Sequence, residues 1–132
     1  MIGVDSNVLV RFFVDDDAKQ AESARRFMKQ RTRDDPAFVS ALVLAELAWA
    51  LKANYDYEKD RVYAALAIVL GSFNIVVEQE KLIAEALRTG RARGADVADS
   101  IIAALALEAG CERIVTFDRS AARGIPGMEL LK

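Results

Sequence analysis

The sequence predicts a three-layer α/β/α domain with a mainly parallel central sheet. A length of 132 residues fits one domain, which we expect over residues 1–132. Hydrophobic residues make up 53% of the chain and charged residues 29%, as in ordinary folded proteins and unlike disordered ones. Short apolar runs that are typical of strands alternate with helical patterns along the whole chain, which favours parallel strands joined by helices.

Strands and helices alternate in the first half of the chain. Ile2–Val4 is a short apolar run that meets cap-forming residues, so we expect a strand and then a short helix over Val8–Phe13. Apolar residues recur at helical spacing among charged ones from Asp15 to about Arg33, which predicts an amphipathic surface helix that a proline ends. A strand over Ala37–Val39 and a mostly buried helix from Leu42 to about Ala53 follow.

In the second half, glycines and β-rich runs mark the boundaries. Gly71, Gly94 and Gly110 each follow a helical pattern, as expected where helices end. The expected elements, in order, are a helix over Tyr57–Leu70, a strand over Phe73–Val77, helices over Glu78–Arg93 and Asp96–Ala109, a strand over Arg113–Phe117, a short turn or helix after Asp118, and an edge strand over Met128–Leu131.

The composition narrows the chemistry that is open to the chain. Histidine is absent, which excludes histidine-ligated zinc sites, Ser/His triads and Cys/His dyads within the chain. The lone Cys111 cannot form an internal disulfide, so we expect a reducing, cytoplasmic environment. We also expect no membrane span, because the longest nearly apolar run is too short and too polar. Carboxylates, amines, hydroxyls or the thiol must therefore carry any reaction.

Two aspartates follow predicted strands at their carboxyl ends, where ligands bind in open parallel sheets. Asp5 ends the first strand, and Asp118 ends the strand that contains Thr116. An aspartate at a strand-to-helix junction is also a common helix N-cap, so both roles stay open for each residue.

Asp96 and Asp99 are three residues apart and lie on one face at the start of a predicted helix. For Asp96 the pattern favours a capping role. Asp99 can complement the helix dipole, but the apolar residues next along its face, Ile102, Ala103 and Ala106, predict that it lies inward.

Glu46 lies in the middle of a strongly apolar helical pattern. A buried carboxylate without a partner costs several kcal/mol, so we expect it to have a counter-charge or to line a cleft. The alternative is a partly exposed glutamate on the one wet face of the helix.

Asp5, Glu46, Asp99 and Asp118 could gather into one acidic cluster. Their motifs contain no nearby basic partner, so the four carboxylates repel one another unless a divalent cation neutralises them. Mg²⁺ and Mn²⁺ prefer oxygen ligands and bridge to phosphate oxygens. Such a site can activate water for an in-line displacement at phosphorus.

Four segments of the chain resemble motifs of PIN-domain ribonucleases of the VapC toxin type, which belong to toxin–antitoxin pairs. The segments occur in the order of that family and span nearly the whole chain, with Ser6 where the family commonly has threonine. They are residues 4–9 (Val-Asp-Ser-Asn-Val-Leu), 44–47 (Leu-Ala-Glu-Leu), 96–104 (Asp-Val-Ala-Asp-Ser-Ile-Ile-Ala-Ala) and 115–119 (Val-Thr-Phe-Asp-Arg).

The resemblance implies a PIN-like fold and a Mg²⁺- or Mn²⁺-dependent endoribonuclease that acts on RNA. It implies that Asp5, Glu46, Asp99 and Asp118 form the acidic pocket, with Asp5 and Asp99 as direct metal ligands. Ser6, Asn7 and Thr116 would be supporting hydrogen-bonding residues, and Asp96 a possible further member. It also implies a cognate antitoxin that blocks the pocket, and a homodimer.

Basic and aromatic side chains suggest further surfaces, although the net charge is −2 and the isoelectric point about 5.2. A solvated helix face explains the first basic cluster, whereas phosphate contact stays open for the other two. Aromatic residues on adjoining helices could form an association surface or simply belong to the core. The basic clusters are Arg25, Arg26, Lys29, Arg31 and Arg33; Arg88, Arg91 and Arg93; and Arg119 and Arg123. The aromatic residues are Trp49, Tyr55, Tyr57 and Tyr63.

Two alternatives remain. A haloacid-dehalogenase-like phosphohydrolase would use Asp5 as a nucleophile, but it needs a second aspartate where this chain has Asn7. A catalytically silent interaction module would use its acidic residues only as helix caps, and Glu46 argues against that.

Overall fold

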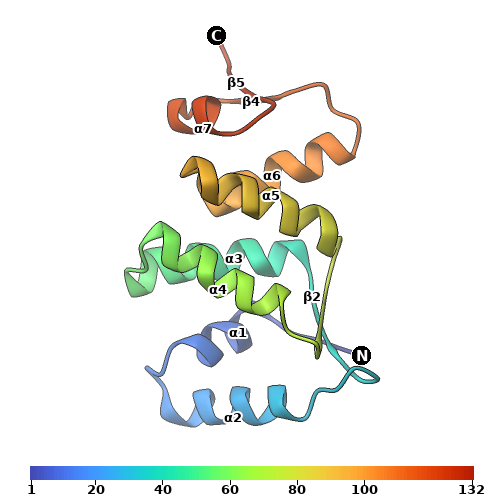
Figure 1. Cartoon of the computed structure of the whole chain (residues 1–132). Coiled ribbons are helices and arrows are strands. Elements are labelled where there is room, and N and C mark those ends of the chain that lie inside the picture. The colour runs from blue at the N-terminus through green and yellow to red at the C-terminus, as the bar shows by residue number, and fades with distance from the viewer. The chain divides into compact units, whose positions relative to one another are not determined.

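A computed structural model describes all residues from 1 to 132 as seven helices and five strands (Figure 1). The chain divides into two compact units, Met1–Glu80 and Lys81–Lys132. Each unit is described by itself below. That residues 1–132 form a single domain stays a prediction.

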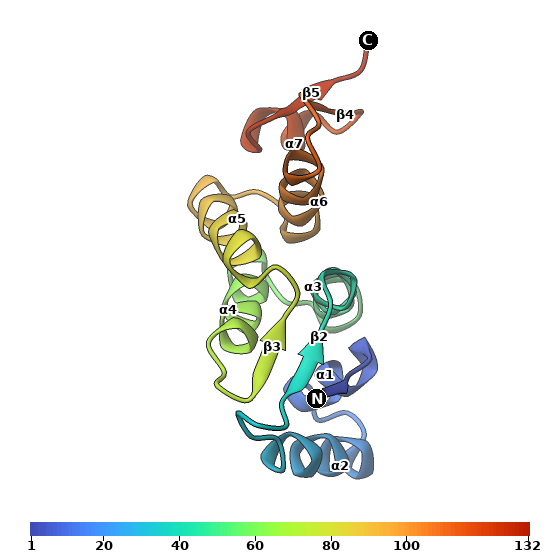
Figure 2. The ribbon, with the colours of Figure 1, turned by 90° about the vertical axis from the view of Figure 1, so that its right-hand side faces the viewer.

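The first unit contains a three-stranded parallel sheet with the strand order β1-β2-β3. Ile2 pairs with Ala37, and Ala37 pairs with Ile75, so β2 lies between β1 and β3, and Figure 2 shows β2 and β3 side by side. Every pairing here is parallel, as predicted. The elements of this unit are β1 (Ile2–Gly3), α1 (Ser6–Phe13), α2 (Ala18–Lys29), β2 (Ala37–Val39), α3 (Ala41–Tyr55), α4 (Lys59–Leu70) and β3 (Ile75–Val77).

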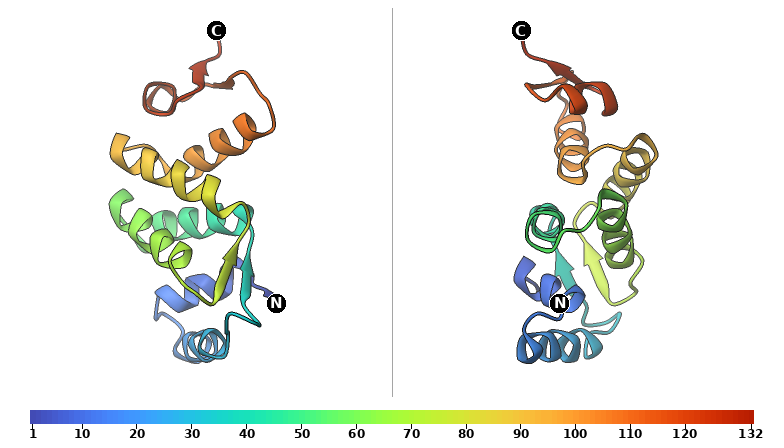
Figure 3. Two further views of the ribbon diagram at one scale, coloured as in Figure 1. Left: turned by 45° about the vertical axis from the view of Figure 1, so that its right-hand side comes forward. Right: turned by 90° about the vertical axis from the view of Figure 1, so that its left-hand side faces the viewer.

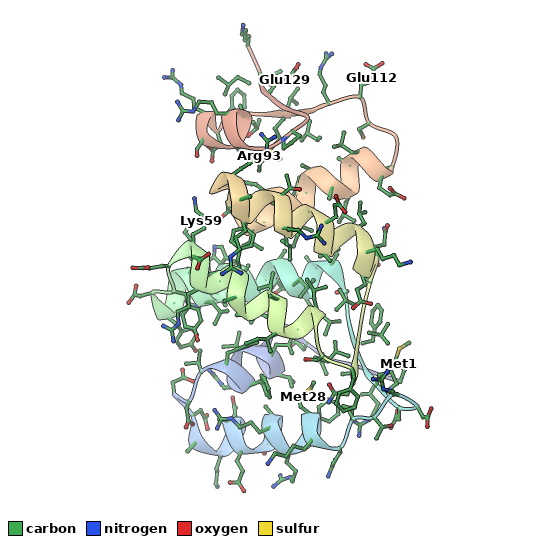
Figure 4. The ribbon with its side chains drawn as sticks, in the orientation of Figure 1. Met1, Met28, Lys59, Arg93, Glu112 and Glu129 are labelled. Carbon is green, nitrogen blue, oxygen red and sulfur yellow. The ribbon has the colours of Figure 1, made fainter.

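The core of the first unit lies between its helices. α1 packs against both α2 and α3, and α3 packs against α4 (Figure 1). Met28, on the side of α2 that faces α1, is buried (Figure 4). Several large side chains are almost fully buried: Leu9, Leu44, Leu47, Leu51, Leu66 and Val69.

In the second unit, a two-stranded parallel sheet packs against short helices. Ile114 pairs with Met128 across this sheet, and α7 connects the two strands (Figure 3). Gly127 precedes the last strand with φ +89°, and a Cβ there would lie 3.3 Å from the Leu107 side chain, so glycine suits this turn. The elements are α5 (Glu80–Arg93), α6 (Val97–Glu108), β4 (Ile114–Thr116), α7 (Arg119–Gly124) and β5 (Met128–Leu130), and a small core contains Ala95, Ala103, Ala121, Ile125 and Met128.

Every expected element is present, and the boundaries differ by a few residues because caps set the helix starts. α2 begins only after Asp17, whose side chain accepts a hydrogen bond from the backbone of Gln20, so the predicted start at Asp15 was too early. α3 begins after Ser40, which accepts from Val43 in the same way. No helix in the structure is both long and apolar enough to cross a membrane.

The aromatic residues do not form the shared surface that the sequence suggested. Tyr63 is buried at 3% exposure and belongs to the core. Tyr57 stacks under the guanidinium of Arg61, and Tyr55 is half-buried in a hydrogen-bonded cluster. Trp49 alone of the four is exposed, at 65%, because it lies on the outward side of α3.

Candidate active site

Asp5 lies in the link between β1 and α1, and local hydrogen bonds orient both of its carboxylate oxygens. Its backbone is extended, and it caps α1. Asp5 Oδ1 accepts a hydrogen bond from the backbone N–H of Ser6 at 2.8 Å, and Oδ2 accepts from Asn7 Nδ2 at 3.2 Å. The side chain is exposed, so the carboxylate is held in place and still open to a ligand.

Ser6 connects Asp5 to Glu46, forty residues later in the chain. Ser6 is buried, and its Oγ lies 3.5 Å from both Asp5 Oδ1 and Glu46 Oε2. One hydroxyl proton can be donated to only one acceptor at a time, so the two carboxylates share a single donor. The first unit therefore brings two of the four candidate carboxylates around one hydroxyl group.

Glu46 is exposed, which matches the alternative of a glutamate on the solvent-facing side of its apolar helix. α3 places Leu44, Leu47 and Leu51 in the core, while Leu42 and Trp49 lie exposed on the same stripe as Glu46. Helical spacing puts residues 42, 46 and 49 on one face, and this face of the helix is exposed to solvent. Water and Ser6, rather than a counter-charge, therefore accommodate the carboxylate.

A cavity of about 590 Å³ in the first unit opens beside Asp5. It runs between α1 and α2, with Asn7 and Arg11 on one wall and Gln20, Ser23 and Phe27 on the other. Arg11 is the one basic residue among those lining it.

Arg11 belongs to a hydrogen-bonded cluster that the motifs did not indicate. Its Nη1 donates to Asp16 at 2.7 Å and to the Tyr55 hydroxyl at 3.0 Å, its Nε donates to Gln20 at 2.8 Å, and the Tyr55 hydroxyl donates to Asp16 at 2.8 Å. The hydrogen bond to Tyr55 and the nearby charge of Asp16 raise the pKa of Arg11. The cluster ties α1 to α2 and α3, and only tertiary contacts reveal it.

In the second unit, Asp96 caps α6 by accepting a hydrogen bond from the backbone N–H of Asp99 at 3.2 Å. The capping role that the pattern favoured for Asp96 is therefore present. Asp99 is half-buried in the first turn of the helix. Ala103 on its face is buried, but Ile102 is 52% exposed, so the predicted packing of this face is only partial.

Asp118 follows β4 and caps α7. Its Oδ1 accepts from the backbone N–H of Ala121 at 3.1 Å, and its own backbone N–H donates to Thr116 Oγ1 at 3.0 Å. The side chain is exposed, which leaves the second carboxylate oxygen open. Thr116 therefore helps to position Asp118 through the backbone.

Within each unit, no three carboxylate or thiol side chains gather closely enough to hold a metal ion. The first unit brings together Asp5, Ser6, Asn7 and Glu46, and the second unit pairs Asp96 with Asp99 and Thr116 with Asp118. No lysine or arginine forms a salt bridge with Asp5 or Glu46. Two carboxylates that share one hydroxyl, with no basic partner, form a donor set that suits a hard divalent cation.

Two of the basic clusters are at least partly engaged by acidic neighbours. Arg25 and Arg26 each lie 3.8 Å from an acidic side chain, and Arg31 is buried against Asp35 at 2.8 Å and over the ring of Phe27. In the second cluster, Arg88 lies 3.7 Å from Glu85. Arg25 and Arg26 fit the solvated helix face that was predicted for the first cluster, whereas Arg31 lies beyond the end of α2 and is buried.

Comparison with known proteins gives a family match over most of the chain. The family model described as PIN domain matches residues 2–124. A VapC ribonuclease of Aquifex aeolicus (strain VF5) is 24% identical over 116 residues, which cover 88% of this chain and 86% of that protein. The family match contains all four motifs and confirms the fold class that the sequence predicted. The chain belongs to the PIN domain family and has its three-layer α/β/α fold with parallel strands.

Proposed function

We propose that this protein is a divalent-metal-dependent endoribonuclease that hydrolyses phosphodiester bonds of RNA. Asp5, Glu46, Asp99 and Asp118 are its catalytic carboxylates, and Asp5 and Asp99 bind Mg²⁺ or Mn²⁺ directly. The observation that carries the proposal is the PIN domain match over residues 2–124, which contains all four acidic motifs in order. The name of the Aquifex aeolicus relative, VapC ribonuclease, supports RNA as the substrate.

The supporting residues of this chain have distinct tasks. Asn7 and the backbone of Ser6 hold the Asp5 carboxylate, and the Ser6 hydroxyl keeps Glu46 beside it. Thr116 and the cap of α7 hold Asp118, while Asp96 orients the turn that carries Asp99. A bound divalent cation would supply an activated water and offset negative charge on the phosphate. The products would be a 5′-phosphate and a free 3′-hydroxyl.

We further propose that the protein is the toxin of a type II toxin–antitoxin pair that acts in the cytoplasm. Its partners would be a cognate antitoxin and a second copy of this chain. The VapC relative supports the toxin role. Light scattering of the purified chain tests self-association, and a monomer at high concentration would remove the homodimer.

Metal binding and cleavage test the reaction together. We expect wild-type protein to bind Mn²⁺ in calorimetry, to cleave RNA with Mg²⁺ or Mn²⁺, and to lose cleavage in EDTA. The variant Asp5→Asn should lose Mn²⁺ affinity and cleavage while it remains folded, because asparagine caps a helix about as well as aspartate does.

Asp17→Asn is the matched control, since Asp17 also caps a helix in the first unit but lies outside the acidic motifs. Its metal affinity and cleavage should equal those of the wild type. Equal Mn²⁺ affinity in Asp5→Asn and wild type would contradict the metal site. Cleavage in EDTA or 2′,3′-cyclic phosphate ends would contradict metal-assisted hydrolysis, and a wild type without any nuclease activity would favour the silent interaction module.

A further inference from the structure

A basic pocket of about 810 Å³ lies in the second unit, and Arg119, the residue that follows the catalytic candidate Asp118, lines it. Residues of β4, α7 and β5 line it together with the residues after β5, and one of them, Glu129 of β5, is labelled in Figure 4. Four basic side chains and a single acidic one line this pocket. They are Arg113, Arg119, Arg123 and Lys132, with Glu129.

Most of this positive charge has no partner within the protein. Arg113 forms a salt bridge with Glu129 at 2.9 Å, so these two charges offset each other. Arg119, Arg123 and Lys132 form no salt bridge, and all three are exposed. Three cations without counter-charges in one hollow attract a ligand that carries several negative charges.

The spacing of the two arginines suits neighbouring phosphates of one strand. Arg119 and Arg123 are four residues apart, so they lie on the same side of α7, about 6 Å apart along the helix axis. Arg119 directly follows Asp118, whose carboxylate the helix cap holds. An RNA backbone that contacts Arg119 is therefore held by the immediate sequence neighbour of the catalytic candidate.

Apolar side chains line the rest of the pocket and favour a single strand over a duplex. Val115 is 50% exposed and Leu131 is 48% exposed, although both line the hollow. Unpaired bases and riboses can rest on such a surface, whereas a duplex keeps its bases stacked inside.

We propose that this basic pocket binds the sugar–phosphate backbone of single-stranded RNA, with Arg119 and Arg123 on successive phosphates next to Asp118. This proposal rests on the proposed ribonuclease function, and it names the surface on which the enzyme binds its RNA substrate.

The test measures the affinity of the full chain for a fluorescent single-stranded RNA by anisotropy in EDTA, over a range of salt concentrations. We expect the double variant Arg119→Gln/Arg123→Gln to raise Kd by about tenfold and to lower the salt slope by about 1.4, since each phosphate contact of a single strand contributes about 0.7. In cleavage assays with Mn²⁺ the same variant should raise KM more than it lowers kcat.

The matched control is Arg25→Gln/Lys29→Gln, which removes two charges at the same spacing from α2. It should leave the salt slope unchanged. If both double variants lost RNA affinity equally, the loss would reflect net charge alone, and the proposal that this pocket binds RNA would be wrong. If an acidic peptide displaces the fluorescent RNA as well as unlabelled RNA does, the proposal is also wrong, and the pocket would bind a protein instead.

The two proposals can fail separately. If wild-type protein cleaves RNA and the α7 double variant binds RNA normally, the pocket is wrong and the ribonuclease stands. If wild-type protein binds RNA through the arginines but never cleaves it with Mg²⁺ or Mn²⁺, the pocket stands and the ribonuclease is wrong. If wild-type protein does not bind the RNA, the pocket is overturned.

Discussion

Ser6 shows how one small residue can organise a site. It is buried at 8% exposure, its backbone N–H donates to Asp5, and its hydroxyl oxygen lies 3.5 Å from the carboxylates of both Asp5 and Glu46. Serine keeps the hydroxyl of the threonine that is common in the resembling family. The 3.5 Å separation is longer than a usual O–H···O hydrogen bond, so the contact is weak and adds little to the stability of the fold.

At this scale we predict that Glu46→Gln separates activity from stability. Glutamine keeps an oxygen that can accept from Ser6, and the residue is exposed, so the free energy of unfolding should change by less than about 0.5 kcal/mol. Cleavage should be abolished, because glutamine lacks the negative charge of the proposed catalytic carboxylate. Urea unfolding and RNA cleavage rates check the two parts. Full activity in this variant would remove Glu46 from the site.

Helix caps explain why several candidate catalytic residues occur where they do. Asp5, Asp96 and Asp118 each precede a helix and accept a hydrogen bond from a backbone N–H of its first turn. Capping and catalysis do not exclude each other, because a capping carboxylate uses one oxygen and is held rigidly by the helix. The alternative roles weighed from the sequence are therefore compatible at these three positions.

At the scale of the element, two variants of Asp118 separate its roles. Asp118→Ala removes the cap of the six-residue α7, so the free energy of unfolding should fall by about 1 kcal/mol. This variant should also lose cleavage. Asp118→Asn keeps the cap, so it should lose cleavage at nearly wild-type stability. Thermal unfolding and cleavage of both variants check this. Wild-type cleavage in Asp118→Asn would show that the cap is the only role of this residue.

For the whole molecule, the two compact units differ in their spectroscopic probes. Trp49 and the three tyrosines all lie in Met1–Glu80, whereas Lys81–Lys132 contains neither residue type. Aromatic fluorescence therefore reports on the first unit alone, while far-ultraviolet circular dichroism reports on the helices of both.

We predict that the 132 residues unfold as one cooperative domain. Urea denaturation followed by fluorescence and by circular dichroism should then give coincident curves with one midpoint. Two separated midpoints would mean that the units unfold independently and that the single-domain prediction is wrong.

The sequence by itself determined the class of fold, the order of all the elements and the four acidic motifs, since these depend on local periodicity, on capping residues and on residue type. It could not determine that Glu46 is exposed, because the side of α3 that faces solvent depends on which of its sides packs against α1 and α4. Nor could it predict the contact of Ser6 with Glu46, the Arg11–Asp16–Tyr55 cluster, or that Lys132 joins the two arginines of α7 around one pocket. Each of these joins residues from different elements, and only the tertiary structure decides which residues of separate elements meet.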